Sequence, residues 1–373
     1  MINMTLKPGE IFSEKPLTQQ DKQFVVQIKE QNKTHTVDKT ELASLIAQAN
    51  AAYQKHFDKT VWFERSIFTN WTCGIADCRY CYLSTKPKLE KKAIRSRESI
   101  LAEALVCKVM KWRVGYITGG LRVESTQDMT QLLKSLHDVL EYKVNMNYGP
   151  YFPRELDSFQ EHVGGLGSAI ESFDEQLHNF ICPSKPLAAL LRFLGECKNR
   201  NIPTFITIIL GIGEKKSDID TVIEKIREFN ISCVQLCYLK PQQGTCFEDI
   251  HPPDPEYMAW WTAKLRIAYP KLIIKIALVK DRIEDFSLML QAGANCFSRY
   301  MIFQDFASPF ALALKQECEK VGRVLEGNFT HVPDLATQEI IDSLPFDEQT
   351  NQQIGVRFLQ YVKRLQKQQE KHA

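Results

Sequence analysis

The chain has 373 residues, of which 44% are apolar and 25% are charged. Its 47 Lys and Arg residues nearly balance its 45 Asp and Glu residues, so the formal net charge is only +2. This balance argues against a protein that coats nucleic acid or an anionic membrane. No apolar run approaches the roughly 20 residues of a membrane helix, and the N-terminus lacks the apolar stretch of a signal peptide. We therefore expect a cytoplasmic protein.

Residues 1–62 have the composition of an N-terminal extension. The first part is polar and mixed, with one short strand-like piece, FVVQI at 24–28. Apolar residues with helical spacing then predict a helix over 40–57, for which Asp38 or Thr40 is the N-cap.

Residues 63–306 alternate short apolar runs with amphipathic helical stretches. Such alternation is typical of a parallel sheet, and eight strands predict an α/β fold of the TIM type, a closed or nearly closed (β/α)8 barrel. Residues 307–373 then predict a C-terminal helical extension, with helices at 309–321, 335–343 and 346–368 and an irregular segment after the first. The predicted strands cover 67–71, 114–118, 143–148, 166–171, 204–210, 233–239, 272–279 and 295–303.

The eleven cysteines are too few for a disulfide scaffold, and their number is odd. Three of them, Cys73, Cys78 and Cys81, form a C-x4-C-x2-C run directly after the first predicted barrel strand. Thiolates at this spacing favour a metal centre at the C-terminal mouth of the barrel. Structural zinc usually takes four ligands in two spaced pairs, whereas three thiolates on a [4Fe–4S] cluster leave one iron open.

This cysteine loop, with the aromatic Tyr80 before its last cysteine, resembles the cluster loop of the radical SAM superfamily. The usual spacing there is C-x3-C-x2-C, so this chain has one extra residue between the first two cysteines. The resemblance covers about residues 66–305. It implies a [4Fe–4S] cluster bound by Cys73, Cys78 and Cys81, and S-adenosylmethionine as the second cofactor.

Thr118, Gly119 and Gly120 end the second predicted strand and resemble the family's GGE segment, whose backbone receives the amino group of S-adenosylmethionine. Glycines let a backbone approach a ligand closely. Leu121 stands where the family usually has an acidic residue, so the contact would depend on backbone carbonyls. The alternative is an ordinary turn between a strand and a loop.

Further segments resemble the cofactor-binding parts of biotin-synthase-like members. Glu171, at the end of the fourth predicted strand, matches the carboxylate that holds the ribose hydroxyls, and Lys185 lies near the usual position of an Arg that grips the methionine carboxylate. Ile209 and Gly211 fit the motif that packs under the adenine. The alternatives are an acidic residue at a helix start for Glu171 and an exposed cation for Lys185.

These segments are similar to biotin synthase, the [FeFe]-hydrogenase maturase and methylornithine synthase. Biotin synthase holds a second, sulfur-donating cluster on inner strand positions, which fall near Tyr116, Met146 and Phe205 here, so such a cluster is not expected. The cluster region also resembles proteins of [Fe]-hydrogenase cofactor maturation and of two-protein lipoyl synthase. Four of the other cysteines lie near the barrel ends and are the candidates for one further ligand or radical participant: Cys182, Cys237, Cys246 and Cys296.

Polar and aromatic residues occupy strand positions that we interpret as inward-facing, where TIM barrels more often place Val, Ile and Leu. Such a lining indicates a small polar or charged substrate, with Arg299 as a carboxylate clamp. The alternative is a hydrogen-bonded core layer. The predicted substrate residues are Asn145, Asn147, Tyr148, Gln235, Tyr238, Arg299 and Tyr300.

The resemblance implies a radical SAM enzyme that takes a hydrogen atom from a small organic substrate in cofactor biosynthesis or maturation. One alternative is sulfur insertion as one part of a two-protein lipoyl synthase. Alternatives of another class are a non-catalytic iron–sulfur or zinc scaffold, or an oxidoreductase barrel with incidental cysteines. The expected partners are a small-molecule or carrier-bound substrate, an electron donor such as ferredoxin or flavodoxin, and a second radical SAM protein; neither nucleic acid nor a membrane is expected.

Overall fold

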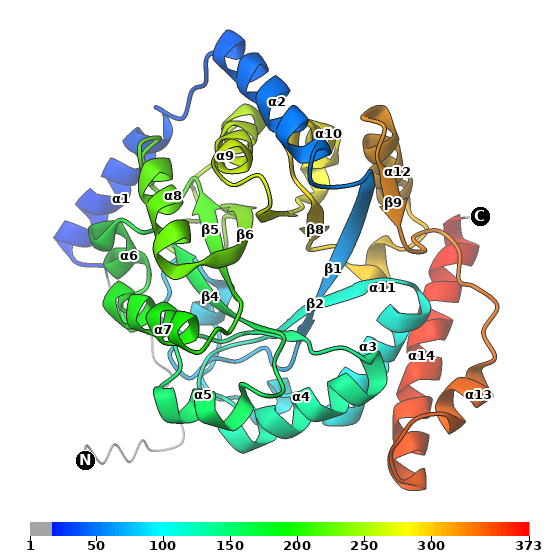
Figure 1. The fold of residues 1–373 in the computed structure, drawn as a ribbon. Helices are drawn as coiled ribbons and strands as arrows, with labels where there is room; N and C mark the ends of the chain where they lie inside the picture. Colours follow the sequence, from blue (N-terminus) through cyan, green and yellow to red (C-terminus); the bar gives the residue numbers. More distant parts are fainter. Residues whose placement is uncertain (1–16, 373) are drawn as a thin grey trace, which may run out of the picture.

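The computed structural model describes residues 17–372. Its centre is a barrel of eight parallel strands with helices around the outside (Figure 1). Helical segments connect successive strands, as the alternating pattern predicts. The strands are β1 (Thr60–Phe68), β2 (Arg113–Thr118), β3 (Asn145–Asn147), β4 (Gly165–Glu171), β5 (Thr204–Leu210), β6 (Ile231–Tyr238), β7 (Ile273–Ala277) and β8 (Cys296–Ser298).

Strand β1 closes the barrel because it pairs with both β2 and β8. Phe68 lies opposite Thr118 of β2, and Phe63 lies opposite Phe297 of β8. The predicted closed (β/α)8 fold is therefore confirmed. In such a barrel, functional groups gather at the C-terminal ends of the strands.

Some strand bounds differ from the prediction. Strand β1 begins at Thr60, so the boundary expected after residue 62 falls within it. Strands β3 and β8 each have only three residues. At the end of β8 the backbone turns, because Arg299 adopts a left-handed conformation with φ of 64°.

The helices between the strands form the outer layer of the barrel. Their N-caps follow the usual chemistry; Ser96, for example, accepts a hydrogen bond from the backbone N–H of Ser99 at the start of α3. These helices are α3 (Arg97–Val109), α4 (Thr126–Leu140), α5 (Pro153–Phe159), α6 (Glu175–Ile181), α7 (Leu187–Asn199), α8 (Asp218–Phe229), α9 (Pro255–Ala268) and α10 (Phe286–Gln291).

From residue 17 on, the N-terminal extension contains two helices, α1 (Gln19–Asn32) and α2 (Lys39–Gln54). The strand predicted at 24–28 is wrong, because this segment lies within α1. A capping box between Thr18 and Asp21 starts the helix, and Ile28 is its one buried residue, so no sheet face covers the apolar run. Helix α2 confirms the helix predicted there, with Asp38 as its N-cap, and packs against α9.

The C-terminal extension contains α11 (Ile302–Asp305), α12 (Pro309–Lys320), α13 (Thr337–Asp342) and α14 (Glu348–His372). The segment predicted to be irregular contains a short strand, β9 (Val324–Glu326), which pairs with the first residues of β1. Helix α14 packs along α3, on the right-hand side of Figure 1. The extension is therefore attached to the barrel through a strand as well as through helices.

The barrel interior is polar and crossed by side-chain contacts. The Tyr116 hydroxyl of β2 donates to Gln235 Oε1 of β6 at 3.1 Å, and the Tyr116 ring stacks on Phe205 of β5. Below this layer, Lys275 of β7 forms an ion pair with Glu64 of β1. Both charged side chains are largely buried, so each supplies the countercharge that the other needs.

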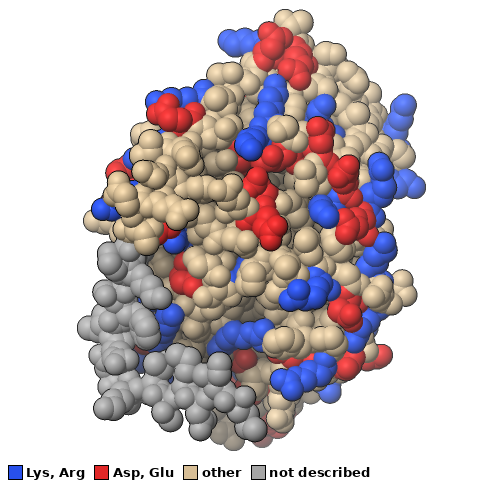
Figure 2. All heavy atoms as spheres, turned by 90° about the vertical axis from the view of Figure 1, so that its left-hand side faces the viewer, with Lys and Arg blue, Asp and Glu red and all other residues tan. Residues whose placement is uncertain are grey.

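The surface carries both signs of charge. On the face shown in Figure 2, Lys and Arg side chains are interspersed with Asp and Glu side chains. Within residues 17–372, no helix combines the length and apolar character needed to cross a membrane.

Candidate active site

The three-cysteine loop lies where the sequence places it, directly after β1 at the C-terminal mouth of the barrel. It ends in a short 3-10 helix, η1 (Tyr82–Thr85), which begins directly after Cys81. Cys73 is buried, whereas Cys78 and Cys81 are partly exposed. The pKa of Cys81 is raised to about 12, mainly because the thiol is buried and to a smaller extent because Cys78 is close by.

Cys73 lies against backbone donors. Its Sγ accepts hydrogen bonds from the N–H groups of Ala76 and Leu121, each at 3.3 Å. Hydrogen bonds to the sulfur ligands are one of the ways in which proteins tune iron–sulfur clusters. Among residues 17–372, no three His, Cys, Asp or Glu side chains form one compact group for a metal ion, so a centre that uses all three thiols requires the loop to adjust.

A fourth cysteine, Cys182, contacts the loop. It is fully buried at the end of α6, and its thiol hydrogen-bonds to Cys78. This contact is the main cause of the lowered pKa of Cys78, and it raises the pKa of Cys182 well above its usual value. The sequence suggested Cys182 only as one of four cysteines near the barrel ends, because its distance from Cys78 along the chain hides the contact.

Tyr80, Glu171 and Lys185 come together beside the loop. The Tyr80 hydroxyl donates to Glu171 Oε1, and Lys185 Nζ lies 3.8 Å from the same oxygen. Lys185 also donates to the Ala169 carbonyl at 2.7 Å. Burial disfavours its charged form, but the nearby Cys182, Cys78 and Glu171 raise its pKa.

Two features of this group suit a ligand. Lys185 is 4% exposed, so the alternative of a solvent-exposed lysine is wrong. The second carboxylate oxygen of Glu171, Oε2, is buried and has no hydrogen-bond partner. A carboxylate with a free oxygen can accept hydrogen bonds from a diol, which is the role that the sequence predicts for Glu171.

The glycine pair after β2 packs tightly against the start of the cysteine loop. A Cβ on Gly120 would lie 1.7 Å from the Thr72 carbonyl oxygen, and a Cβ on Gly119 would lie 2.6 Å from Asn70 Nδ2. Any side chain at either position would push the loop away. The glycines are therefore needed for close approach of the two backbones, and Thr118, the last residue of β2, leads into this contact.

A carboxylate missed in the sequence lies beside the glycine pair. Glu124 accepts from Asn70 Nδ2 at 2.8 and 3.0 Å and from the Thr69 hydroxyl at 2.5 Å, while Asn70 Oδ1 accepts from the Gly120 N–H at 2.8 Å. An acidic residue is thus present four positions after Gly120, at Glu124, although Leu121 itself is apolar. A search that allowed a longer spacing after the glycines would have found it.

Ile209 lies near the end of β5, and Gly211 follows that strand directly. Ile209 belongs to a buried apolar cluster that Cys78 and Tyr80 contact. Gly211 has a φ of 91°, and its N–H donates to both oxygens of Glu214. Glu214 therefore fixes the turn after β5, and Ile209 supplies an apolar surface.

Helix α1 holds the cysteine loop from outside the barrel. Arg79, between Cys78 and Tyr80, pairs with Asp21 of α1 at 2.5 Å, and its guanidinium lies 4.3 Å from the centre of the Phe180 ring. Phe24 of α1 packs on the same ring. The polar extension thus contributes directly to the placement of the loop.

Three of the predicted substrate residues face the barrel interior. Gln235 contacts Tyr116 and also lies 3.4 Å from the hydroxyl of Ser298 on β8. Asn145 and Asn147 share one face of β3, because side chains alternate along a strand. Met146 between them accepts a hydrogen bond from Tyr151, whose ring packs against outer helices, so the asparagines point inward and Met146 outward.

Two of the three predicted tyrosines, Tyr238 and Tyr300, do not line the interior, so this part of the interpretation is wrong. Tyr238 lies three residues after Gln235, which places it on the opposite face of β6, under the Arg282 guanidinium. Tyr300 is fully buried among aromatic rings outside the barrel, including Phe63. The third, Tyr148, contacts the Thr69 hydroxyl at 2.5 Å, and Thr69 donates to Glu124 beside the glycine pair.

Arg299 stands at the barrel mouth. It is exposed, and among residues 17–372 no hydrogen bond or ion pair involves its guanidinium. Its charge acts on the inward-facing Cys237 of β6, where burial raises the pKa of the thiol and Arg299 opposes that rise. A cation held at the mouth without a partner suits an anionic group, as the sequence predicts.

A closed barrel with a thiol-rich loop at its mouth, beside a buried carboxylate and lysine, defines a barrel protein of the iron–sulfur class. Residues 72–226 match the family model described as the radical SAM superfamily. The uncharacterized protein MJ0597 of Methanocaldococcus jannaschii is 30% identical over 84% of this chain and 88% of its own length. A biotin synthase of Pelodictyon phaeoclathratiforme is 25% identical over 60% of this chain and 70% of its own. The chain belongs to the radical SAM superfamily.

Solved structures support the same fold. Methylornithine synthase (PylB) superposes with a TM-score of 0.65 at 17% identity, covering 83% of this chain and 94% of its own. The [FeFe]-hydrogenase maturase HydG of Carboxydothermus hydrogenoformans superposes with a TM-score of 0.63 at 14% identity, and the match covers 95% of this chain and 93% of the HydG chain.

Membership of the family implies a [4Fe–4S] cluster and S-adenosylmethionine as cofactors. The residues present fit these groups. The three loop cysteines supply thiolates, backbone N–H groups already point at one of them, and Glu171 has a free buried oxygen. Cys73, Cys78 and Cys81 are the residues that would hold the cluster.

Proposed function

We propose that this radical SAM enzyme acts on a small, polar, anionic organic substrate bound at the barrel mouth, in the biosynthesis or maturation of a cofactor. The observation that carries the proposal is the continuity of two groups of residues. The cysteine loop follows β1 and Glu171 ends β4, while Arg299 follows β8 and Asn147 ends β3. The charges of Arg299 and Glu171 both act on the inward-facing thiol of Cys237, which links the two groups across the barrel mouth. Both groups are at the C-terminal strand ends, where barrel enzymes place their chemistry.

When bound, the cofactors of this family supply a 5′-deoxyadenosyl radical that abstracts a hydrogen atom from the substrate. The chain itself binds, orients and shields. Glu171 would accept hydrogen bonds from the ribose hydroxyls at its free Oε2, and Tyr80 fixes the carboxylate by donating to its other oxygen. Lys185 supplies the buried positive charge for the methionine carboxylate, as a point charge rather than a bidentate fork.

The interior residues would set the substrate class. Arg299 offers a fork of donors that matches a carboxylate or a phosphate. The amides of Asn145, Asn147 and Gln235 add neutral donors and acceptors deeper in the barrel, although Asn145 already donates to the Gly115 carbonyl at 2.8 Å. The substrate we expect carries one anionic group and several hydrogen-bonding atoms.

Sulfur insertion, as one part of a two-protein lipoyl synthase, is the second candidate. Tyr116 and Phe205 face the interior and are not cysteines. However, Cys296 Sγ lies 3.8 Å from Glu64 inside the barrel, and Cys233 lies near the same ion pair. The number of irons per chain separates the candidates: about four favour hydrogen abstraction, and about eight favour sulfur insertion.

The test is anaerobic reconstitution, followed by iron counting and an assay for 5′-deoxyadenosine from S-adenosylmethionine and dithionite. We expect Cys78→Ala to lose both the cluster and the cleavage, whereas Cys107→Ala, in a helix far from the loop, keeps both. One zinc per chain with no cleavage would instead establish the alternative of a metal scaffold.

A further inference from the structure

The segment that follows the cysteine loop has an unusual concentration of positive charge. Residues 86–92 contain four lysines and one glutamate, which gives this short stretch a formal charge of +3. The whole chain carries only +2. The four lysines are exposed: Lys86, Lys88, Lys91 and Lys92.

The segment is fixed against the residue that precedes the first loop cysteine. The Thr72 hydroxyl donates to the Pro87 carbonyl at 3.2 Å and accepts from the Glu90 N–H at 3.0 Å. The Trp71 N–H donates to the Ala93 carbonyl at 2.9 Å. The lysines are therefore held beside the cysteine loop, since Thr72 is the neighbour of Cys73.

Exposed apolar side chains lie among these lysines. Trp71 is 47% exposed, Leu89 54% and Ile94 39%. The Trp71 ring is not loose, because it stacks on Phe68 and lies under the guanidinium of Arg95. An ordered apolar centre with a charged rim is the usual composition of a transient protein interface.

We propose that the surface formed by Trp71, Leu89, Ile94 and the lysines of 86–92 docks an acidic one-electron carrier protein. The inference rests on the proposed function, because the cluster needs one electron for each cleavage. The reduced carrier loses that electron and the cluster gains it, with no bond of the chain made or broken. Charge complementarity selects an acidic partner and speeds its encounter.

A carrier at this surface also fits the geometry of the loop. Helix α1 covers the flank with Arg79, whereas the flank with Thr72 is bordered by the lysine segment. An aromatic and aliphatic centre distinguishes this surface from a simple anion site, for which lysines alone would serve. The fixed backbone means that a partner docks on a preformed surface.

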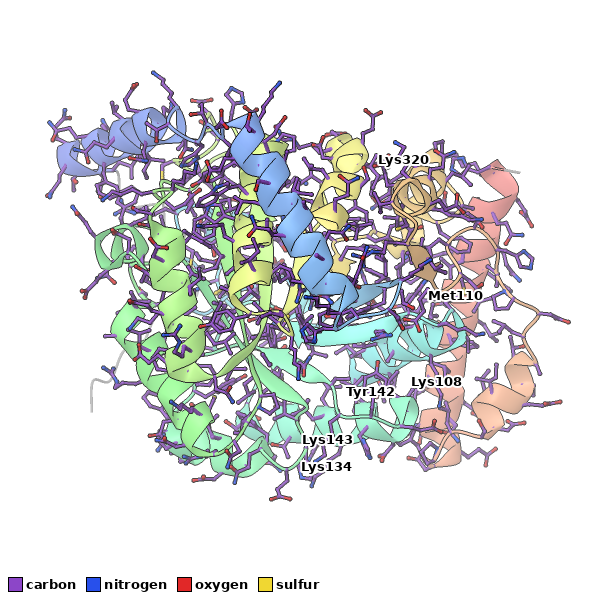
Figure 3. The ribbon with its side chains drawn as sticks, turned by 45° about the horizontal axis from the view of Figure 1, so that its top comes forward. Lys108, Met110, Lys134, Tyr142, Lys143 and Lys320 are labelled. Atoms are coloured by element: carbon purple, nitrogen blue, oxygen red, sulfur yellow. The ribbon has the colours of Figure 1, made fainter. Side chains whose placement is uncertain are left out.

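The test compares two charge-reversal variants. Lys91→Glu/Lys92→Glu removes positive charge from the proposed surface. The matched control, Lys134→Glu/Lys143→Glu, makes the same change at the opposite end of the barrel, where both lysines line a cavity of about 180 Å³ with His137 and His162. Figure 3 shows the two control lysines close together; Lys134 lies within α4, and Lys143 lies just before β3.

The probe is a purified flavodoxin. We expect the Lys91/Lys92 variant to bind it roughly tenfold more weakly at low salt, with little difference at high salt because ions screen the charges. Reduction of the cluster by reduced flavodoxin should slow by a similar factor, whereas reduction by dithionite should not change. The control variant should behave as the unmodified protein.

Three outcomes would overturn the inference. The Lys91/Lys92 variant binds flavodoxin as well as the unmodified protein does, or the control variant loses flavodoxin binding to the same extent. In the third outcome, the Lys91/Lys92 variant loses binding only to an acidic substrate-carrying protein and still binds flavodoxin. Failure of the proposed function is a separate result, since it appears as absence of the cluster or of cleavage with dithionite. Flavodoxin binding is measured on the protein whichever result the cleavage assay gives.

Discussion

Replacement of Lys275 by Met should destabilise the protein strongly, because it leaves a buried carboxylate without its countercharge. The Lys275 side chain is 2% exposed and pairs with Glu64 in the barrel interior. Its ammonium lies 4.9 Å from the centre of the Tyr116 ring and 5.8 Å from that of Phe205. Burial alone would raise the pKa of Glu64, but Lys275 holds it below its usual value.

The expected loss follows from the burial of the pair. Removing one partner of a buried ion pair costs about 3–5 kcal/mol, whereas replacing both by neutral groups of similar size is often close to neutral. The entropy of unfolding is about 2.1 cal/mol/K per residue, so a chain of this length has about 0.8 kcal/mol/K. The loss of about 3–5 kcal/mol therefore lowers Tm by roughly 4–6 °C.

The assay is thermal unfolding at pH 7, monitored by calorimetry and by circular dichroism. It compares the unmodified protein with Lys275→Met, Glu64→Gln and the double variant. We expect the double variant to recover most of the loss seen in Lys275→Met. A Tm for Lys275→Met within about 1 °C of the unmodified protein would refute the reasoning, as would a double variant whose loss equals the sum of the single losses.

The site and the outer layer lead to two further predictions. Cys182→Ala removes the thiol that hydrogen-bonds to Cys78, so the midpoint potential of the cluster, measured by EPR-monitored redox titration, should fall while about four irons are retained. Cys182→Ser should restore much of this shift in potential. Loss of all iron in Cys182→Ala would contradict this role. Burial opposes ionisation of Glu103, but Arg65 and Arg95 lower its pKa, so its contribution to stability is present above about pH 4.5 and is lost as the pH falls. The Tm difference between Glu103→Gln and the unmodified protein should therefore shrink from pH 7 to pH 3, and a constant difference would count against it.

The features of the site that lie close together in the chain could be predicted from the sequence. The cysteine run, the glycine pair and the turn at Gly211 are each local, and each lies at a strand end because alternating strands and helices fix where strand ends meet. Glu171 could be placed for the same reason. By contrast, Cys182 and Asn70 reach the site through contacts between distant segments, which no local pattern reports, whereas Glu124 lies only four residues after Gly120 and was missed because of its spacing.

The errors also have physical causes. Tyr238 was predicted to face inward because it lies near the end of a strand. Side chains alternate between the two faces of a strand, so an inward-facing Gln235 places Tyr238, three residues later, on the outer face. For the segment around Val25 and Val26, β-branched residues suggested a strand, but a capping box and the absence of a strand partner outweighed that propensity. Tyr300 belongs to a cluster of aromatic rings outside the barrel that β9 and its neighbours complete, and this cluster forms only in the folded chain.

The cysteine loop is held from two sides by parts of the chain that the sequence presents as unrelated to it. On one flank Asp21 of α1 pairs with Arg79, and on the other Thr72 bonds to the backbone of the lysine segment at two points. Because both flanks are fixed, the loop stays at the barrel mouth, and the adjustment that brings the three thiols to one centre is confined to the residues between those flanks. The same anchoring fixes the exposed lysines next to those thiols, so the position of the cysteines and the position of the docking surface have one structural cause.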